Sequence, residues 1–469
     1  MKKLKVIVHL ISSNLLLIII GIFQSFILPK ILEPLEYGKW INYILYTNYA
    51  GLLNIGFCDG IYLEYGGKSY KDLNLIKISN YYYSQQVYLC ICLFIWLVIV
   101  KNIFNNNLFL LYIGITYFFM CNRDFFMALN TATNRLNIHA IVQPIVKIVI
   151  ILGVILCFFK KENSADFIIK FNIIGWIITY IINFYYNKKI ILTKPKKILA
   201  PLKEYFFLCK TGLYLTFSSI IISFFGESGK FFISLKMSLT DLGYYSFVFS
   251  ISGLFIQIFS VLSLVFYPLL KNKSKKNVNI TLRRTEQIIN IIGLLLLPLY
   301  YPIRLMLEIL FPQYNIGMDN LIFIFPIIVI QSKMNIIFLT IYKIWRLEKE
   351  MLKTLTIGVI ISLIITFLGI TVKRSIFIIA GCNYISFVLW NIITIVELNK
   401  IKKLKWKYNY LELTNIFVFI LINIFFKFTL ISFILTLLEI IITLYIRRIE
   451  ILKLINYLIR KTQKIKNYS

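Results

Sequence analysis

Two lysines lie near the middle of long apolar segments. Lys147 follows Gln143 by four residues, which places both on one face of an expected helix. Lys333 lies in the sequence Gln331-Ser-Lys-Met-Asn335, with an amide on either side. A charge at the centre of a bilayer costs about 2.5 to 3.5 kcal/mol on insertion scales, so such a lysine needs a polar surrounding. We predict that these five residues line a polar cavity for an anion. The alternative is a lysine whose ammonium reaches the membrane surface or is neutralised by burial.

Polar and small side chains also recur at helical spacing in three apolar segments. Residues three and four apart share a helix face, so each set could form one wall of a cavity. The sets are Thr216, Ser219, Ser223, Glu227 and Lys230; Ser246, Ser250, Gly253, Gln257 and Ser260; and Asn14, Gly21, Gln24 and Ser25. From them we predict six further cavity residues: Asn14, Gln24, Ser219, Ser223, Lys230 and Gln257. The alternative is that small residues let helices pack closely within the lipid.

Glu227 and Lys230 are three residues apart and admit two interpretations. They could form a surface ion pair in which each neutralises the other. Alternatively, Glu227 binds a coupling proton or cation while Lys230 contacts the transported molecule. We keep Glu227 as the coupling-ion candidate.

Catalytic and metal-binding patterns are poorly represented. The seven cysteines fall mostly within or beside apolar runs and contain no Cys-x-x-Cys spacing, which is typical of small buried side chains. Two histidines, His9 and His139, give little support for a metal site or a hydrolase triad. We expect no catalytic residue, no metal and no cofactor.

The elements that carry these residues must be membrane helices. The chain has 469 residues, of which 59% are hydrophobic and 15% charged, with a mean hydropathy of +0.79. This composition excludes a soluble globular protein. The formal charge of +31 would suggest nucleic acid in a soluble protein, but here it is better explained by basic loops that face anionic lipid.

Apolar segments long enough to cross a bilayer number fourteen, because a span needs roughly 20 residues of helix. They cover residues 6 to 28, 41 to 58, 82 to 100, 108 to 128, 139 to 159, 165 to 187, 206 to 226, 243 to 268, 287 to 306, 320 to 342, 354 to 372, 376 to 397, 413 to 430 and 432 to 447. The sequence therefore predicts an all-α polytopic membrane protein.

Lysine and arginine are unevenly shared between alternate connections. One set of connections, which includes both termini, holds 36 of them and the other set holds 11. Because basic residues concentrate on the cytoplasmic side, this predicts an even number of spans with both termini in the cytoplasm.

The sequence also contains signs of an internal repeat. Glu36-Tyr-Gly-Lys-Trp40 corresponds to Asp241-Leu-Gly-Tyr-Tyr245 at an offset of 205, and Asn134-Arg-Leu136 corresponds to Trp345-Arg-Leu347 at an offset of 211. We predict two parallel six-helix lobes, since an even number of spans keeps their orientation the same. The expected parts are an N-terminal lobe at 1 to 187, a C-terminal lobe at 206 to 397, an extra helix pair at 413 to 447 and a basic cytoplasmic tail at 448 to 469.

The segment from Phe26 to Trp40, FILPKILEPLEYGKW, resembles a motif of bacterial polysaccharide exporters and of O-antigen and teichoic-acid flippases. In that family the first span ends in Pro before a Leu-Gly-Pro-Glu-Glu-Tyr/Phe-Gly-like turn. This sequence departs at Glu33, where the family usually has Gly. The stretch from Gly226 to Lys230, followed by Leu242-Gly-Tyr-Tyr245, is similar to the start of the second half in these proteins. They belong to the multidrug/oligosaccharidyl-lipid/polysaccharide exporter superfamily.

The resemblance implies a two-lobed flippase in the bacterial cytoplasmic membrane. Its substrate would be an undecaprenyl-diphosphate-linked oligosaccharide destined for a surface polysaccharide such as O-antigen or capsule. The implied partners are this lipid-linked oligosaccharide, membrane lipid and a polysaccharide polymerase or glycosyltransferases, with no nucleic acid.

Two other functions stay open from the sequence. An ion-coupled multidrug or cation antiporter of the same superfamily would need buried acids, and the segment from Val6 to Leu28 has none. A polyprenyl-sugar glycosyltransferase or polymerase would need catalytic residues on sizeable outer loops, whereas the outer loops here are short. Glu33, Glu36 and Asp241 are explained as turn and cap residues.

Overall fold

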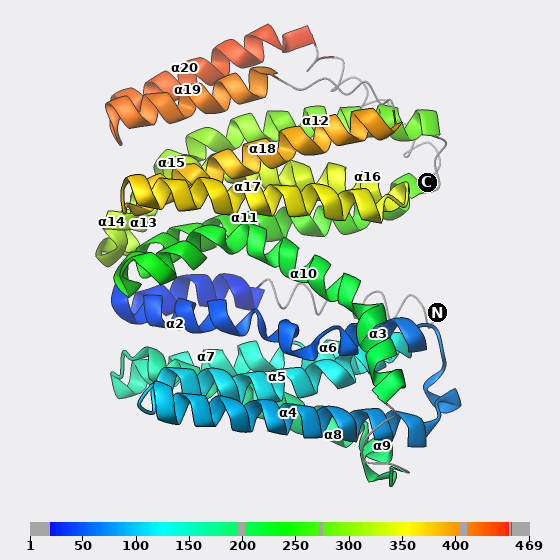
Figure 1. The fold of residues 1–469 in the computed structure, drawn as a ribbon. Helices are drawn as coiled ribbons and strands as arrows, with labels where there is room; N and C mark the ends of the chain where they lie inside the picture. The colour runs from blue at the N-terminus through cyan, green and yellow to red at the C-terminus, as the bar shows by residue number, and fades with distance from the viewer. Residues whose placement is uncertain (1–18, 196–201, 272–274, 403–409, 450–451, 453–469) are drawn as a thin grey trace. The chain divides into compact units, whose positions relative to one another are not determined.

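The computed structural model describes residues 19–195, 202–271, 275–402, 410–449 and 452 (Figure 1). The described residues form helices and loops with no β-strand, which confirms the predicted all-α class. They divide into two compact units, residues 1–246 and 247–469. Unit 1 and unit 2 below refer to these two parts.

Unit 1 begins with the apolar helix Ile19–Ile31. The further helices of this unit are α2 (Pro34–Thr47), α3 (Phe57–Tyr65), α4 (Leu75–Ile103), α5 (Leu108–Ala132), α6 (Leu136–Val142), α7 (Ile145–Lys160), α8 (Ala165–Tyr186), α9 (Lys188–Leu192), α10 (Leu202–Lys236) and the start of α11 (Leu239–Lys271). A buried aromatic cluster joins α3, α4 and α5, with Phe57, Tyr82 and Phe125 at its centre. Helix α10, which covers the start of the predicted C-terminal lobe, packs against α3 within unit 1.

The described residues of unit 2 form the rest of α11 and the α-helices that follow it. They are α12 (Lys275–Leu296), α13 (Tyr300–Leu310), α14 (Asn315–Met318), α15 (Leu321–Lys333), α16 (Leu339–Ile344), α17 (Glu348–Val372), α18 (Ile376–Lys402), α19 (Tyr410–Phe426) and α20 (Leu430–Ile446). Helix α15 is the most enclosed, and a π-helical turn at Met334–Phe338 joins it to α16. Helices α19 and α20 pack together as a pair and contact α15, α12 and the turn Leu297–Leu299 (Figure 1).

The membrane spans lie where the sequence predicts them, with one exception. Eight helices in the described part of the chain are long and apolar enough to cross a membrane, and α10 is a ninth if its two parts, bent by 55°, form one span. Three shorter apolar helices, Ile19–Ile31, Leu411–Phe426 and Leu430–Ile446, fall on predicted segments, and α5 covers another. The chain is therefore a polytopic membrane protein.

The exception is the segment predicted as one span from 41 to 58. It is divided into α2 and α3 by a short 3-10 helix and by two residues with positive φ, Ile55 (44°) and Gly56 (78°). Glycine is required at position 56 for a second reason, because a Cβ there would lie 2.5 Å from the Leu213 backbone nitrogen. A hydropathy pattern does not detect this break, since the residues around it stay apolar.

The first pair of similar sequences meets in space within unit 1. A Cβ on Gly38 would lie 1.8 Å from the carbonyl oxygen of Leu239, and a Cβ on Gly243 would lie 2.0 Å from that of Pro34. Gly243 lies 205 positions after Gly38, and Leu239 lies 205 positions after Pro34. The two contacts therefore join equivalent positions of the two motifs. Glycine permits this backbone contact between α2 and α11. The predicted duplication itself stays a prediction.

The second pair also has matching geometry, but its register is shifted by one residue. At the end of α5, Asn134 has a φ of 57° and the Arg135 N–H donates to the Asn130 carbonyl. At the end of α16, Arg346 has a φ of 52° and the Leu347 N–H donates to the Tyr342 carbonyl. The structural offset is therefore 212, where the letters alone suggested 211.

Two of the three acidic residues that the sequence analysis explained as turn and cap residues, Glu36 and Asp241, accept hydrogen bonds at the starts of helices, whereas Glu33 at the N-cap of α2 forms no side-chain capping bond. Glu36 Oε2 accepts the backbone N–H of Ala165 at 2.7 Å, at the start of α8, while its Oε1 pairs with Lys39 Nζ at 2.6 Å. Asp241 Oδ2 accepts the backbone N–H and the hydroxyl of Ser238. These carboxylates are engaged in structural contacts.

Candidate functional site

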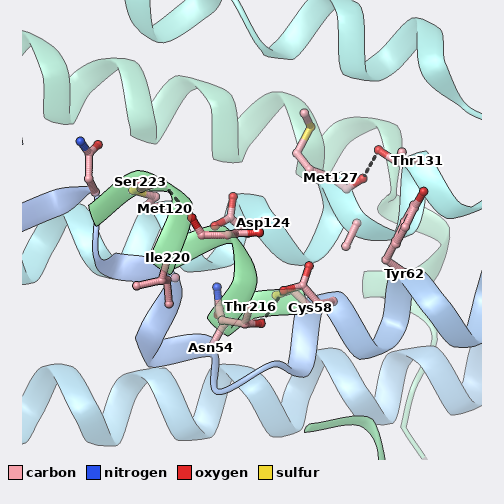
Figure 2. Close-up of a pocket in the computed structure, with 15 residues that line it drawn as sticks. Asn54, Cys58, Tyr62, Met120, Asp124, Met127, Thr131, Thr216, Ile220 and Ser223 are labelled. Atoms are coloured by element: carbon pink, nitrogen blue, oxygen red, sulfur yellow. Dashed lines mark hydrogen bonds between the residues drawn. The ribbon is translucent and has the colours of Figure 1, made fainter. Parts of the chain in front are cut away.

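A cavity of about 410 Å³ opens within unit 1 between α3, α5 and α10 (Figure 2). Nine of the described side chains around it can form hydrogen bonds through oxygen or nitrogen, and none of its lining residues is Lys, Arg or His. The lining consists of Asn48, Gly51, Asn54, Cys58, Asp59, Tyr62, Met120, Asp124, Met127, Ala128, Thr131, Thr216, Ser219, Ile220 and Ser223. We call it the acidic cavity, after Asp59 and Asp124.

Close backbone packing between α3 and α10 brings the first wall together. A Cβ on Gly60 would lie 2.0 Å from the Leu208 carbonyl oxygen, and a Cβ on Gly212 would lie 1.9 Å from that of Gly56. With the helices this close, Asp59 on α3 accepts a hydrogen bond from the Thr216 hydroxyl on α10. No described Lys, Arg or His lies within ion-pair distance of Asp59.

Asp124 on α5 forms the opposite wall and carries a local countercharge. Its Oδ1 accepts two hydrogen bonds from Arg123, at 3.0 Å from Nε and 2.6 Å from the terminal guanidinium nitrogen. The guanidinium also lies 4.8 Å from the ring centre of Trp176, which holds it beside α8. The second carboxylate oxygen of Asp124 has no partner among the described residues.

Asn54 contributes a buried amide donor, Nδ2, that has no described hydrogen-bond partner. Its residue is 7% exposed, and its Oδ1 accepts a hydrogen bond of 3.2 Å from Gln85 Nε2. This bond orients the amide so that Nδ2 is left without a partner among the described residues, at the wall of the cavity (Figure 2). A buried amide donor of this kind favours a ligand or water that can accept from it.

The acidic cavity therefore combines two carboxylates, two amides and several hydroxyl groups. Carboxylates accept hydrogen bonds from hydroxyl and ammonium groups, and amides and hydroxyls can both donate and accept. The arrangement suits a polar ligand rich in hydroxyl groups, and its charge disfavours an anion.

Ser219 and Ser223, predicted as cavity residues from the spacing on α10, line the acidic cavity. Glu227, one turn further along α10, accepts from Asn48 Nδ2 at 3.4 Å and pairs with Lys230 Nζ at 3.8 Å. Their side chains are 22% and 16% exposed. Since Asn48 lines the cavity, Glu227 stands beside it.

Lys147 and Gln24 come together in unit 1. Gln24 Nε2 donates to the backbone carbonyl of Lys147 at 3.3 Å, which connects the first helix to α7. Lys147 is half-buried and has no carboxylate within ion-pair distance in the described part of the chain. Gln143 is half-buried at the end of α6, next to Pro144. None of the three is among the lining residues of the acidic cavity.

Lys333 lies in unit 2 between two carboxylates. Its Nζ is 2.7 Å from Glu412 Oε2 on α19 and 3.2 Å from Glu286 Oε1 on α12. The three side chains are 3%, 10% and 11% exposed, so they form a buried ion-pair cluster. The sequence analysis placed an anion beside Lys333, and the structure provides two from the protein itself.

The remaining predicted residues are distributed through the chain. Gln331 and Asn335 are half-buried on either side of Lys333, and Gln257 is exposed on α11. Asn14 lies outside the described residues.

Sequence reasoning missed the acidic residues of the cavity in unit 1 and of the ion-pair cluster in unit 2. Predicted spans began at 287 and 413 and one ended at 58, so Glu286, Glu412 and Asp59 each fell one residue outside. Asp124 lay within the predicted span from 108 to 128 but was not proposed as a cavity residue. Hydropathy windows stop at charges, and this removes the intramembrane acids from view. A useful signal was the helical extension of each segment beyond its apolar stretch.

Comparison with solved structures relates the fold to membrane transporters. No protein-family model matches the sequence, and no curated protein matches it. The structure of "Lipid II flippase MurJ, inward closed conformation" superimposes with a TM-score of 0.70 at 14% identity, covering 96% of this chain and 100% of that one. An inward-facing multidrug resistance MATE family transporter of the MOP superfamily gives a TM-score of 0.48 at 10% identity, covering 83% and 100%. This chain therefore has the fold of a solved lipid II flippase.

Proposed function

We propose that this protein flips a polyprenyl-diphosphate-linked oligosaccharide across the bacterial cytoplasmic membrane for surface polysaccharide synthesis. The observation that carries the proposal is the likeness to the lipid II flippase, which spans nearly the whole chain. The substrate named for that protein is a lipid-linked molecule, and the motif from Phe26 to Trp40 suggested the same class. Alternating access of the two halves would move the substrate.

The polar groups of unit 1 fit two parts of such a substrate. The acidic cavity offers carboxylates, amides and hydroxyls, which suit the hydroxyl groups of sugars. Lys147 offers a positive charge with no described carboxylate partner, which suits a diphosphate. Glu227 beside Asn48 is the proposed site for a coupling proton or cation.

The proposal is tested by deleting the gene in its own host. We expect surface polysaccharide to be lost and the lipid-linked oligosaccharide to accumulate where a membrane-impermeant reagent added outside cannot modify it. Restoring the full chain should reverse both effects. Unchanged surface polysaccharide with no accumulated intermediate would contradict the proposal.

A cation or drug antiporter is the second candidate. The acidic cavity favours it, because Asp59 and Asp124 would attract a cationic compound. Purified protein in vesicles should then expel cationic dyes in response to a proton or sodium gradient. A flippase of the proposed kind should leave the dye distribution unchanged.

A further inference from the structure

The charge of the acidic cavity bears on which glycan the protein accepts. We propose that this cavity binds the sugar headgroup and selects an amine-bearing sugar over a neutral one, while it rejects glycans with carboxylate or phosphate groups. The inference rests on the proposed function, since it identifies the substrate class of that transporter. It concerns only unit 1, where all the lining residues lie.

Asp59 is the centre of the selection. It lines the cavity, and its described hydrogen bond comes from the neutral Thr216 hydroxyl. A carboxylate that receives one neutral hydrogen bond and has no described cationic partner retains further acceptor capacity. An ammonium group on a sugar can use this capacity, with a charge-assisted hydrogen bond that is roughly twice as strong as a neutral one.

Asp124 is the second carboxylate of the cavity, and it is paired with Arg123. Arg123 uses only Oδ1 of Asp124, and Trp176 holds the guanidinium from the side of α8. Arg123 itself does not line the cavity. Asp124 thus belongs to the lining of the cavity, whereas the cationic residue paired with it does not.

The amide and hydroxyl groups provide the recognition of the neutral part of the sugar. Asn54 Nδ2 is an enclosed donor without a described partner, and Ser219 and Ser223 are exposed hydroxyls on the α10 wall. Ligand cavities typically have volumes of about 300 to 1,000 Å³, so about 410 Å³ accommodates a small sugar headgroup. An anionic sugar would place its charge against two carboxylates in a partly desolvated site, which is costly.

The test uses the purified full chain in lipid nanodiscs and a matched set of disaccharides. The probes are the glucosamine disaccharide, its N-acetylated form and a galacturonic acid disaccharide, at about pH 6, where sugar amines are protonated. We expect the glucosamine form to bind about tenfold more tightly than the acetylated form, a ratio that corresponds to about 1.4 kcal/mol. The galacturonic acid form should show no saturable binding.

Asp59→Asn should remove this preference, so that the glucosamine and acetylated forms bind within about twofold of each other. The conservative change Asp59→Glu should retain it. The matched control is Glu64→Gln, which removes a carboxylate of the same helix that pairs with Lys68 and does not line the cavity. All variants should elute as folded protein in size-exclusion chromatography.

Equal or tighter binding of the acetylated or anionic disaccharide would overturn the inference. A preference that persists in Asp59→Asn would overturn it as well, because the selection would then come from elsewhere. Neither result would affect the proposed transport itself, which is measured with a lipid-linked oligosaccharide. Conversely, failure of that transport with the charge preference intact would remove the flippase and leave a sugar-binding site.

Discussion

The two intramembrane lysines have the same appearance in the sequence but different surroundings in the structure. Lys333 is almost fully enclosed between Glu286 and Glu412, while Lys147 is half-buried with no described carboxylate near it. The sequence analysis considered either a cavity for an anion or a lysine that reaches the membrane surface or is neutralised by burial. Both interpretations were drawn from the segment that contains the lysine. The two carboxylates beside Lys333 belong to residues 47 and 79 positions away along the chain. Local residue spacing does not reveal such contacts.

Replacing Lys333 should destabilise the protein. Lys333→Met would leave two carboxylates buried side by side, and breaking a buried ion pair in this way costs about 3–5 kcal/mol. We expect a clear loss of thermal stability and of folded protein, measured by size-exclusion chromatography after heating. Lys353→Met is the matched control, because its pair with Glu397 is 60% exposed on the lysine side.

A triple variant tests whether the loss comes from unpaired charge. Lys333→Met combined with Glu286→Gln and Glu412→Gln should recover part of the lost stability, since it removes the unpaired carboxylates. If Lys333→Met keeps full stability and loses only transport, Lys333 contacts substrate instead.

Replacing Lys147 should reduce transport but leave the stability of the protein nearly unchanged. Lys147→Gln removes a cation that has no described carboxylate partner, so stability should change by less than about 1 kcal/mol. Transport of a diphosphate-linked substrate should fall about tenfold or more, because one charge-assisted contact is lost. Lys101→Gln at the exposed end of α4 is the control. Full transport by Lys147→Gln would exclude this residue from the mechanism.

At the scale of elements, sequence patterns located the helices well and their interruptions poorly. Apolar segments predicted α4, α7, α8 and α17 because a lipid-exposed span must be apolar along its whole length. The break between α2 and α3 was missed, since Ile55 and Gly56 are as apolar as a continuous span. The Gly38 and Gly243 motifs were recognised as similar letters, but their mutual contact is visible only in three dimensions.

The crossing of α2 and α11 predicts a strong effect from a very small change. Gly38→Ala would place a methyl group 1.8 Å from a backbone oxygen, which neither helix can avoid by a side-chain movement. Overpacking of this kind typically costs about 1–3 kcal/mol, and it outweighs the gain of about 1 kcal/mol in helix propensity. Thermal stability should therefore fall.

Gly253→Ala in α11 provides the control for this crossing. A Cβ at this position meets no atom within 4 Å, so only the gain in helix propensity applies. We expect unchanged or slightly higher stability. Equal stability of Gly38→Ala and Gly253→Ala would contradict the close contact between α2 and α11.

At the scale of the whole molecule, charge and duplication carry most of the predictable information. The excess of basic residues reflects the connections between spans and says little about the substrate. The charged residues that line the acidic cavity are both acidic, in contrast to the net positive charge of the chain. Their carboxylates lie on helices that are mostly apolar, so the average composition does not reveal them. The total charge of the chain therefore does not predict the charge of its site.

The basic connections also predict an orientation. With 36 Lys and Arg residues on one set of connections and 11 on the other, both termini should face the cytoplasm. Split fluorescent-protein tags at either end should both give signal with a cytoplasmic partner fragment. Signal from one end only would require an odd number of spans and would contradict the predicted even number.

The most direct measurement is transport by the purified full chain in proteoliposomes. A fluorescent polyprenyl-diphosphate-linked oligosaccharide is placed in both leaflets, and a membrane-impermeant quencher is added outside under an imposed proton or sodium gradient. We predict that nearly all fluorescence becomes accessible to the quencher with the wild-type chain, and about half with protein-free liposomes. Accessibility that equals the protein-free value under every gradient would contradict the proposal that this protein flips lipid-linked oligosaccharides.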